Sequence, residues 1–444
     1  MRLLGFYHKY SRYDKDNNFL KSENFNYNNL KNLKRFRRNV EFIDNKENLY
    51  SKKVKLSKKI KKRSIDYLNV KNYREKRMVS EHFKAKWNLP IPYFIDNKVN
   101  QLLVESALRM ISRETCIKFK KYKIMIPHLS GLYYYRGNNC SSLVGRLGRR
   151  IWQSISIGKG CETIGRIQHE TIHALGFYHE HSRYDRDIYI YFAAENVDKE
   201  YYNNFEKVSK KDSNTFGVPF DFGSVMMYGR KMLSKNGKDT MISRDPRYFN
   251  TYGVADQVSY GDVKMLNFYY CSTYCHKKLK CMNEGYQDPN NCNKCKCVKG
   301  FIGQLCNMLS LSTKECGSSK LHATNKMKKF KIKGKKNCIY HIVAEKNKKI
   351  IIKVLNSFFF PNKEHMCHTK NSLEIKYWSS KVSTGARFCL YKTNLIIPSQ
   401  NHHVIIYYRS SYERNFLHFI YKSVPIYFNF SKVFSEFSKY KTLT

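Results

Sequence analysis

The segment His169–Asp187 constrains this chain more than any other stretch, because it places three histidines at fixed intervals. His169 and His173 are four residues apart, so they lie on one face of a helix that turns once in about 3.6 residues. Gly176 follows, where glycine can adopt the left-handed conformation that ends a helix and turns the chain back. That turn brings His179 toward the same point. We therefore expect three imidazoles to share one metal ion.

Glu170 stands beside the first histidine of this set, where its carboxylate can take a proton from water. Three neutral histidines are the donor set of a catalytic zinc, which lowers the pKa of water from about 15.7 toward about 7. An HExxH pentad alone also occurs on ordinary amphipathic helices with surface histidines. The longer HExxHxxGxxH pattern favours zinc. The sequence thus predicts one Zn²⁺, with Glu170 as general base.

A second motif lies downstream, where Asp221–Gly229 reads DFGSVMMYG. In metzincins the extended histidine motif is paired with a turn that carries a methionine beneath the metal. Met226 is the expected turn methionine, and its role is packing. We therefore expect this turn to support the metal site structurally.

Together, HExxHxxGxxHE and SxMxY resemble the astacin family of zinc endopeptidases. The resemblance implies that the three histidines are zinc ligands and that Glu170 is the catalytic glutamate. It also implies that Tyr228 is a further zinc ligand that swings away to stabilise the transition state. Glu180 matches the residue that binds the mature amino terminus through water. Met227 departs from the family, which usually has histidine at that position.

The fourteen cysteines indicate the compartment. None precedes Cys116, and they fall into groups of four, six and four, as in disulfide-bonded extracellular modules. No run of about twenty apolar residues is present, so we expect no membrane span. Met1–Tyr7 is too short for a secretory signal. Because the cysteines indicate secretion, we expect that this amino terminus is not that of the secreted product.

The net charge of +47 raises the question of a polyanionic partner. Residues 78–271 carry the smallest share of it, and no module typical of DNA or RNA binding accompanies it. Abundant lysine, asparagine, tyrosine, isoleucine and phenylalanine are what an A/T-biased coding sequence produces. We expect no specific nucleic-acid partner. Weak attraction to acidic matrix or substrate surfaces stays open.

Residues 1–77 form a basic segment with little periodicity, which we expect to be a poorly ordered pro-region. Within it, Leu4–Asp16 closely repeats Leu175–Asp187 without the preceding HExxH, so we interpret it as a fragment of a second unit of the same kind. The segment ends in RxKR at Arg77, which resembles a furin-type processing site; a solvated basic run is the alternative. The FxGD motif by which astacin propeptides usually block zinc is missing.

Residues 78–271 are the expected α+β catalytic domain. Ile91–Asp96 has strand character, and Gln101–Ile111 and Tyr260–Tyr270 have helical spacing of apolar residues. The TCIKF sequence at Thr115–Phe119 resembles the family's TCIxF. By this resemblance Cys116 pairs with Cys271 and Cys140 with Cys161. The stretch from Cys140 to Gly158 resembles the edge strand that pairs with an extended polypeptide substrate.

Residues 272–306 hold six cysteines in the pattern C-x5-C-x10-C-x2-C-x-C-x8-C. This resembles an EGF-like module, which implies the pairs Cys275–Cys292, Cys281–Cys295 and Cys297–Cys306. A zinc ribbon is the alternative, and the closing CxCx8C disfavours it. No acidic cluster precedes the first of these cysteines, so no calcium is expected there.

After an expected linker at 307–315, residues 316–427 are strand-rich, for example at Lys349–Leu355 and His403–Tyr408. Their cysteine spacing and the LEIKYW and GARFC sequences resemble a CUB domain, an all-β sandwich, with the pairs Cys316–Cys338 and Cys367–Cys389. Residues 428–444 form a basic tail to which we assign no role. The chain is thus expected to be multidomain, with a metzincin catalytic domain, a small disulfide-rich EGF-like module and a CUB sandwich.

The sequence therefore predicts a secreted zinc endopeptidase whose CUB domain contacts substrate or extracellular matrix. The alternative is a matrix- or receptor-binding protein that keeps metal but turns over little and uses its EGF-like and CUB modules. Intact Glu170 and Tyr228 favour the enzyme, because a site losing its activity would lose such residues first.

Overall fold

The structure is a computed structural model that describes residues 86–311, 313–363 and 366–440. These residues belong to one compact unit, residues 75–444. The basic segment 1–77, its internal repeat and the processing site expected after Arg77 lie outside the described residues. Within the described ranges, every helix is too short or too polar to cross a lipid bilayer.

A five-stranded sheet opens the catalytic region, with strand order β2-β1-β3-β5-β4. Its strands β1, β2, β3 and β5 run parallel, whereas β4 runs antiparallel to β5 and forms one edge. In β1 every second residue is buried, so one face of the strand packs on the core. The strand bounds are β1 Ile91–Ile95, β2 Phe119–Lys121, β3 Gly131–Tyr135, β4 Cys140–Ser142 and β5 Trp152–Ile157.

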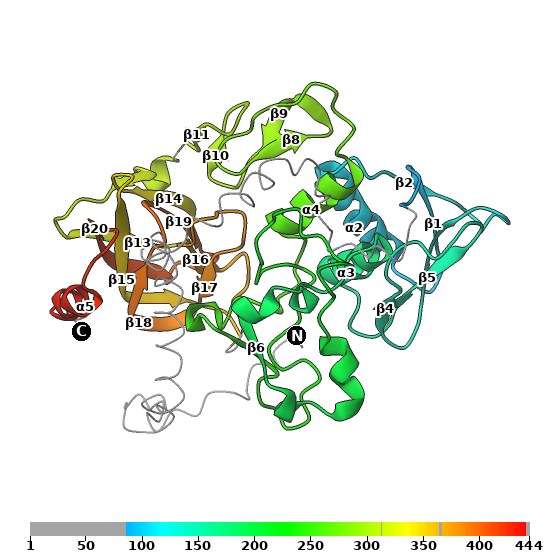
Figure 1. The fold of residues 1–444 in the computed structure, drawn as a ribbon, viewed down its shortest axis with the longest axis horizontal. Coiled ribbons are helices and arrows are strands. Elements are labelled where there is room, and N and C mark those ends of the chain that lie inside the picture. Colours follow the sequence, from blue (N-terminus) through cyan, green and yellow to red (C-terminus); the bar gives the residue numbers. More distant parts are fainter. Residues whose placement is uncertain (1–85, 312, 364–365, 441–444) are drawn as a thin grey trace, which may run out of the picture. The chain divides into compact units, whose positions relative to one another are not determined.

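Three helices pack with this sheet, namely α2 (Gln101–Glu114), α3 (Ile164–Ala174) and α4 (Tyr260–Tyr270). α2 and α3 lie side by side, and α3 also contacts β4 and β5 (Figure 1). Each helix begins at a residue whose side chain caps the first free amides, Asn100, Thr163 and Ser259 in turn. Polar caps and apolar inner faces therefore fix where these helices begin and which side is buried.

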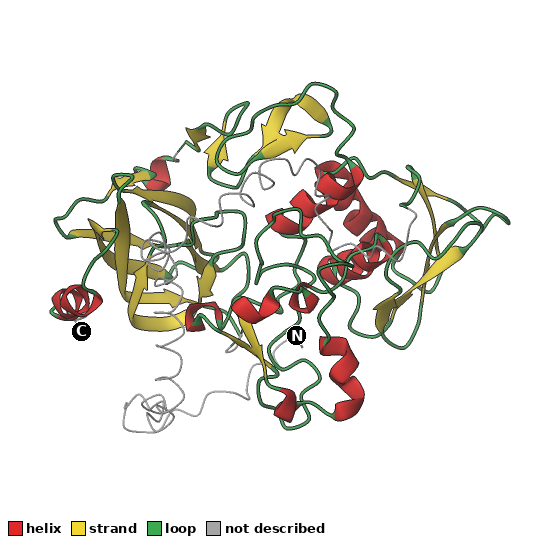
Figure 2. Ribbon diagram, viewed as in Figure 1, coloured by secondary structure: helices red, strands yellow, loops and turns green. Residues whose placement is uncertain are grey.

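The rest of the catalytic region is mostly loops and short turns (Figure 2). Its two short strands, β6 (Ile190–Phe192) and β7 (Met241–Ser243), pair antiparallel. Phe220 and Phe222 are buried here, so aromatic packing replaces regular backbone ladders. The 3-10 turns among the described residues are η2 Glu180–Ser182, η3 Arg186–Ile188, η4 Ala194–Asn196, η5 Lys199–Phe205, η6 Pro246–Tyr248 and η7 Lys314–Cys316.

A small disulfide-rich segment follows, with β8 (Tyr286–Asp288) antiparallel to β9 (Asn291–Lys296). Beyond it, β10 (Phe301–Ile302) pairs with β11 (Met308–Leu309), which lies within the stretch expected to be a linker. This stretch is therefore partly structured. Three disulfides hold the segment: Cys275–Cys292, Cys281–Cys295 and Cys297–Cys306.

Two sheets packed face to face form the C-terminal region, with strand orders β12-β14-β19-β16-β17 and β13-β20-β15-β18. Their inner faces supply an apolar core that includes Ile352, Ile375 and Ile406. Disulfides join Cys316 to Cys338 and Cys367 to Cys389. The strands are β12 Lys320–His322, β13 Lys328–Lys333, β14 Asn337–Val343, β15 Lys348–Phe359, β16 Ser372–Lys376, β17 Ala386–Phe388, β18 Leu390–Pro398, β19 His403–Arg409 and β20 Phe416–Pro425.

The tail, to which the sequence assigned no role, carries helix α5 (Phe430–Ser438). Phe437 is fully buried in a small cluster against the sandwich. Lys353 on β15 donates through Nζ to the carbonyl oxygens of Phe437 (2.9 Å) and Tyr440 (2.8 Å). A lysine ammonium at a helix carboxyl end satisfies free carbonyls and opposes the helix dipole, so this pairing fixes the tail.

The loop between β16 and β17, residues 377–385, joins the sandwich to the catalytic region. Val382 is buried in the same apolar cluster as the residues of α3. Ser383 Oγ donates to the carbonyl oxygen of Phe220 (2.8 Å), and the Thr384 amide donates to Asp221 Oδ1 (2.9 Å). This loop therefore completes part of the catalytic core.

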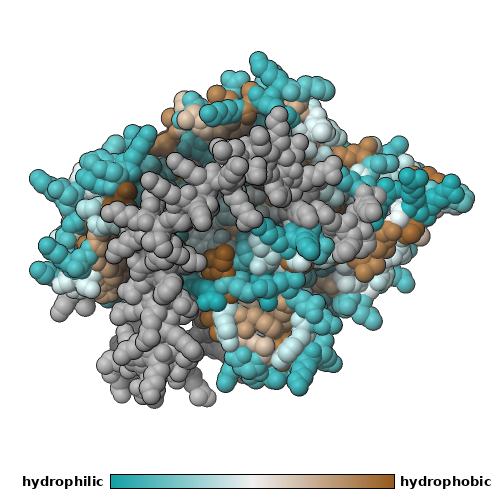
Figure 3. All heavy atoms as spheres, viewed as in Figure 1, coloured by the Kyte–Doolittle hydropathy of each residue, from teal (hydrophilic) through white to brown (hydrophobic). Residues whose placement is uncertain are grey.

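The surface drawn in Figure 3 is mostly hydrophilic where described residues form it, and apolar residues appear as small separate patches. Scattered apolar side chains such as Leu102 and Ile188 are normal on a folded protein.

All fourteen cysteines are paired, and the two disulfides of the catalytic region close loops of very different length. Cys116–Cys271 spans 155 residues and Cys140–Cys161 spans 21 residues. Replacing the first pair with alanine is expected to lower the free energy of unfolding by about 5 kcal/mol, and the second by about 3 kcal/mol, because longer loops lose more unfolded-state entropy. Guanidinium unfolding of both double variants checks the order. Equal losses would contradict the entropic explanation.

Candidate metal centre

α3 and the turn after it bring the three predicted histidines together. His169 and His173 lie on α3, which ends at Ala174. Gly176 has a φ of +105°, and its amide donates to the His173 carbonyl oxygen (2.8 Å), which turns the chain back. The Nε2 atom of His173 then lies 3.0 Å from that of His169 and 3.1 Å from that of His179, with 3.3 Å between the last two.

The partners of the other ring nitrogens fix the tautomers. His169 Nδ1 lies 2.8 Å from the carbonyl oxygen of Val225, and His173 Nδ1 lies 2.7 Å from that of Phe177. A carbonyl only accepts, so each Nδ1 carries the proton and each Nε2 presents a lone pair. Lone pairs facing one another at this separation do not hydrogen-bond, and they need a cation between them.

The donor set fits zinc. Nitrogens bonded to Zn²⁺ at about 2.0 Å in a tetrahedron lie about 3.3 Å from one another, close to the separations of 3.0 to 3.3 Å seen here. Burial lowers the pKa of all three histidines, that of His173 to about 3. Each imidazole is therefore neutral at pH 7, which is the form that binds a metal. Hence the three histidines can hold one Zn²⁺.

Glu170 follows the first histidine on α3 and lines the same cleft as the three imidazoles. Its side chain is buried, and this burial raises the pKa of the carboxyl to about 7, although Arg166 one turn earlier opposes the shift. A carboxyl with a pKa near neutrality can both take and return a proton at pH 7. Arg166 also lines the cleft; sequence reasoning missed it, although its i, i+4 spacing from Glu170 was readable.

Tyr228 lines this cleft beside the histidines. Its ring lies 4.2 Å from the ring of His179 and 4.2 Å from that of His181, centroid to centroid. Burial, helped by the nearby Glu170 carboxyl, raises the pKa of the phenol to about 12. The hydroxyl is therefore protonated at neutral pH and can donate a hydrogen bond.

The turn at Ser224–Met227 supports the site from below. Its Val225 carbonyl accepts from His169, and Met226 is buried in the core that contains α3. Asp262 on α4 holds the turn in place, because its carboxylate accepts from Ser224 Oγ (2.6 Å) and from the Val225 amide (2.9 Å). Sequence reasoning missed Asp262, since a capping-box position on a distant helix gave no sign of this second contact.

Glu180, directly after the third histidine, is also buried. Its Oε1 accepts from the Asp221 amide (2.8 Å) and from Arg183 Nη1 (3.3 Å), whereas Oε2 has no partner among the described residues. Burial raises the pKa of this carboxyl to about 8, with Arg183 opposing. The free oxygen leaves room for one more donor at this position.

The cleft has a volume of about 600 Å³ and reaches from the histidines to the edge strand. Cys140–Ser142, which is β4, forms one wall, and Met232 and Leu233 contribute apolar surface to another. β4 pairs with β5 along one side only, so its other side has backbone groups available. An extended peptide chain can therefore lie beside the histidines.

Replacing His173 with alanine is expected to lower zinc affinity by more than about a hundredfold, because losing a ligand costs more than losing a group that orients one. Zinc per chain, measured after dialysis against a weak chelator, checks this. His276→Ala removes an exposed histidine far from the cleft in sequence and should leave zinc content unchanged. Equal zinc in both variants would contradict this ligand set.

Comparison with known proteins agrees with this geometry. A family model described as Astacin, a family of peptidases, matches residues 79–271. Zinc metalloproteinase nas-34 of Caenorhabditis elegans is 36% identical over 338 residues, which cover 75% of this chain and 55% of the relative. Zinc metalloproteinase nas-37 of the same nematode is 38% identical over 347 residues, covering 76% and 43%. The chain thus spans about half the length of these relatives.

Among solved structures, high choriolytic enzyme 1, a hatching enzyme zinc-protease from the medaka fish Oryzias latipes, is 31% identical with a TM-score of 0.38. The match covers 42% of this chain and 92% of that one. With the histidine motif, the turn methionine and the family match on the same segment, the chain belongs to the astacin family of zinc metallopeptidases through residues 79–271.

Proposed function

We propose that this protein is a secreted zinc-dependent endopeptidase that hydrolyses peptide bonds of extracellular proteins. The observation that carries the proposal is the convergence of three neutral imidazole nitrogens in a cleft shared with Glu170 and Tyr228. When bound by these histidines, Zn²⁺ polarises the scissile carbonyl and makes water nucleophilic at neutral pH. The chain's own residues then position the substrate and move the protons.

Glu170 is the proposed proton carrier. Its pKa near 7 lets the carboxylate accept a proton from the attacking water and release it to the leaving amine nitrogen. The cleft that Glu170 shares with the three histidines supports this role, because water held by the metal would lie in the same cleft. Glu170 therefore serves first as general base and then as general acid.

Tyr228 is the proposed donor to the developing charge. Its phenol stays protonated at neutral pH, so the O–H can donate to the oxyanion that forms on the substrate carbonyl. Tilted ring contacts with His179 and His181 keep the side chain at the cleft wall. A donor held in this way stabilises the transition state more than the bound substrate.

Substrate specificity for extended polypeptides follows from β4. This edge strand offers backbone groups on its open side, and an added peptide strand binds through main-chain hydrogen bonds. The apolar wall of Met232 and Leu233 gives the cleft a place for an apolar side chain. Recognition is thus mainly of extended backbone.

Glu180 is proposed to bind the mature amino terminus through water after processing at Arg77. The partnerless Oε2 of this buried carboxyl group supports the proposal, because an unpartnered buried oxygen costs free energy and a donor beside it favours the ionised form of a group whose pKa burial raises to about 8. An ammonium or its bridging water supplies that donor. Docking of the new terminus then couples processing to the order of the segment that carries His179.

The remaining modules are proposed to be an EGF-like module at 272–306 and a CUB domain at 316–427, with matrix or substrate contact through the latter. The disulfide pairs within 275–306 and the two packed sheets with their two disulfides support these assignments. Complete pairing of the cysteines also supports secretion, because disulfides persist in oxidising compartments.

Replacing Glu170 with glutamine is expected to lower kcat for casein cleavage by about 100- to 10,000-fold, because the amide cannot accept the proton. Zinc content should stay at the wild-type level, since the ligands are untouched. The matched control is Glu195→Gln, an exposed glutamate that does not line the cleft. Wild-type protein with full zinc that cleaves neither casein nor gelatin would favour the binding-protein alternative.

Replacing Tyr228 with phenylalanine is expected to lower kcat by roughly 100- to 1,000-fold with little change in KM, because the hydroxyl acts only on the transition state. Tyr191→Phe, at a half-exposed tyrosine outside the cleft, is the control. A raised KM with unchanged kcat would instead assign Tyr228 to substrate binding.

A further inference from the structure

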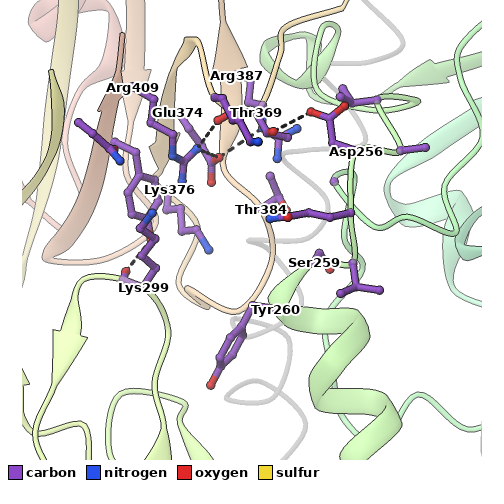
Figure 4. A pocket seen from close by; sticks show the side chains of 18 of the residues that line it. Asp256, Ser259, Tyr260, Lys299, Thr369, Glu374, Lys376, Thr384, Arg387 and Arg409 are labelled. Atoms are coloured by element: carbon purple, nitrogen blue, oxygen red, sulfur yellow. Dashed lines mark hydrogen bonds and ion pairs between the residues drawn. The ribbon is translucent and has the colours of Figure 1, made fainter. Parts of the chain in front are cut away.

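A second cavity, of about 590 Å³, has lining residues largely of its own, and Figure 4 shows most of their side chains. One wall is the outward face of the sandwich sheet that contains β16, β17 and β19, and the facing wall is the loop 254–260 before α4. Lys299 of the disulfide-rich segment adds a third side. Among the described lining residues, Ala255 is the one that this cavity shares with the metal cleft. No part of the proposed proteolysis uses it.

Strand register places the cations of this cavity on one face of the sheet. Glu374 on β16 lies opposite Arg387 on β17 and opposite Tyr407 on β19. Lys376 and Arg409 stand two residues along from these positions, so their side chains point to the same side. The alternate residues of the same strands, such as Ile375 and Ile406, face the apolar core. The register and alternation of these strands therefore determine that the charged side chains share one face of the sheet.

Positive charge exceeds negative charge in the lining. The cavity has five basic residues and two acidic ones among its described lining residues; the basic ones are Lys299, Lys370, Lys376, Arg387 and Arg409, and the acidic ones are Asp256 and Glu374. Glu374 is already saturated, because its oxygens accept from the Gly385 amide (3.0 Å), Arg387 Nε (3.3 Å) and Arg409 Nη1 (2.7 Å). Asp256 accepts from Thr369 Oγ1 (2.7 Å) and lies 3.5 Å from His368 Nδ1. The other three cations, Lys299, Lys370 and Lys376, form no ion pair with a described carboxylate, since Glu374 pairs with Arg387 and Arg409.

Two basic side chains of this cavity, Arg387 and Lys376, keep unused hydrogen-bonding capacity among the described residues. Arg387 is 6% exposed, and neither of its terminal nitrogens has an acceptor among the described residues. Lys376, equally buried, donates only to the carbonyl oxygen of Lys381 (2.7 Å), which is neutral. Burial lowers the pKa of Lys376, with Glu374 opposing the shift. A ligand with several oxygens would supply further acceptors to these charged donors, so such a ligand suits this cavity.

We propose that this cavity binds a sulfate or phosphate group of a small anionic ligand. Such a group offers several oxygens to the guanidinium fork of Arg387 and to the ammonium of Lys376. A cavity of this size is in the range of about 300 to 1,000 Å³ that holds small molecules, so it can take a ligand as large as a sulfated disaccharide. The exposed Lys299 and Lys370 extend the positive charge to solvent. The same chemistry occurs on sulfated sugars and on free inorganic anions.

Isothermal titration calorimetry on the zinc-loaded full chain tests the proposal, with sodium sulfate, sodium phosphate and a trisulfated heparin disaccharide as probes in about 150 mM sodium chloride. The test variant is Lys299→Gln with Lys370→Gln, at exposed lysines whose loss should not disturb folding. The matched control is Lys329→Gln with Lys331→Gln, which removes the same charge from exposed positions of β13. A third variant, Arg387→Lys, keeps the charge but removes the fork.

We expect one binding site per chain, with Kd about tenfold higher in the test variant and in Arg387→Lys, and unchanged in the control. Tighter binding of the disaccharide than of sulfate would identify a sulfated sugar as the source, and equal binding would identify the free anion. Equal weakening in test and control variants would overturn the proposal, because general charge would then explain binding. So would the absence of saturable binding for all three probes. If Arg387→Lys fails to fold, comparison of the double lysine variant with its control still tests the proposal.

Discussion

Three imidazole nitrogens that converge to within 3.3 Å of one another are the arrangement on which the catalytic region depends. His169 and His173 are held by the helix and by carbonyl acceptors on their other nitrogens, and the turn at Gly176 supplies the third ring. Without a cation between them the Nε2 lone pairs of His169 and His173 repel, so metal binding and the stability of this region are linked. The turn beneath the rings and the Asp262 carboxylate that fixes it resist any relaxation of that geometry.

Burial is the largest influence on the pKa values around this point. The same low-dielectric surroundings that keep the histidines neutral raise the pKa of Glu170 to about 7 and that of Tyr228 to about 12. A base near neutrality and a protonated phenol beside a cation are what metal-assisted hydrolysis requires. One desolvated cleft thus holds both a carboxyl group that can accept a proton, that of Glu170, and a phenol that keeps its proton, that of Tyr228.

Most of the successful predictions from the sequence came from patterns within short segments. The histidine motif, the helix at Tyr260–Tyr270 and the strand at Ile91–Asp96 each depend on spacing within a few residues, and the structure has α4 and β1 there. The Zn²⁺ expected from the motif is confirmed by family membership. The features that the sequence did not reveal are contacts between residues that lie far apart in the chain. The contact of Asp262 with the turn, the burial of Phe437 and the cationic sheet face arise only when strands and helices far apart in the chain meet.

The loop at 377–385 has a consequence for how such chains evolve. Val382 fills part of the catalytic core, and its neighbours bond to Phe220 and to Asp221, whose amide in turn reaches Glu180. A sandwich exchanged for one from another gene would leave a hole in that core and take one donor away from the Asp221 carboxylate. The catalytic region and the sandwich are therefore not structurally independent modules. Genetic recombination at their boundary succeeds only when the incoming partner brings a loop of the same shape.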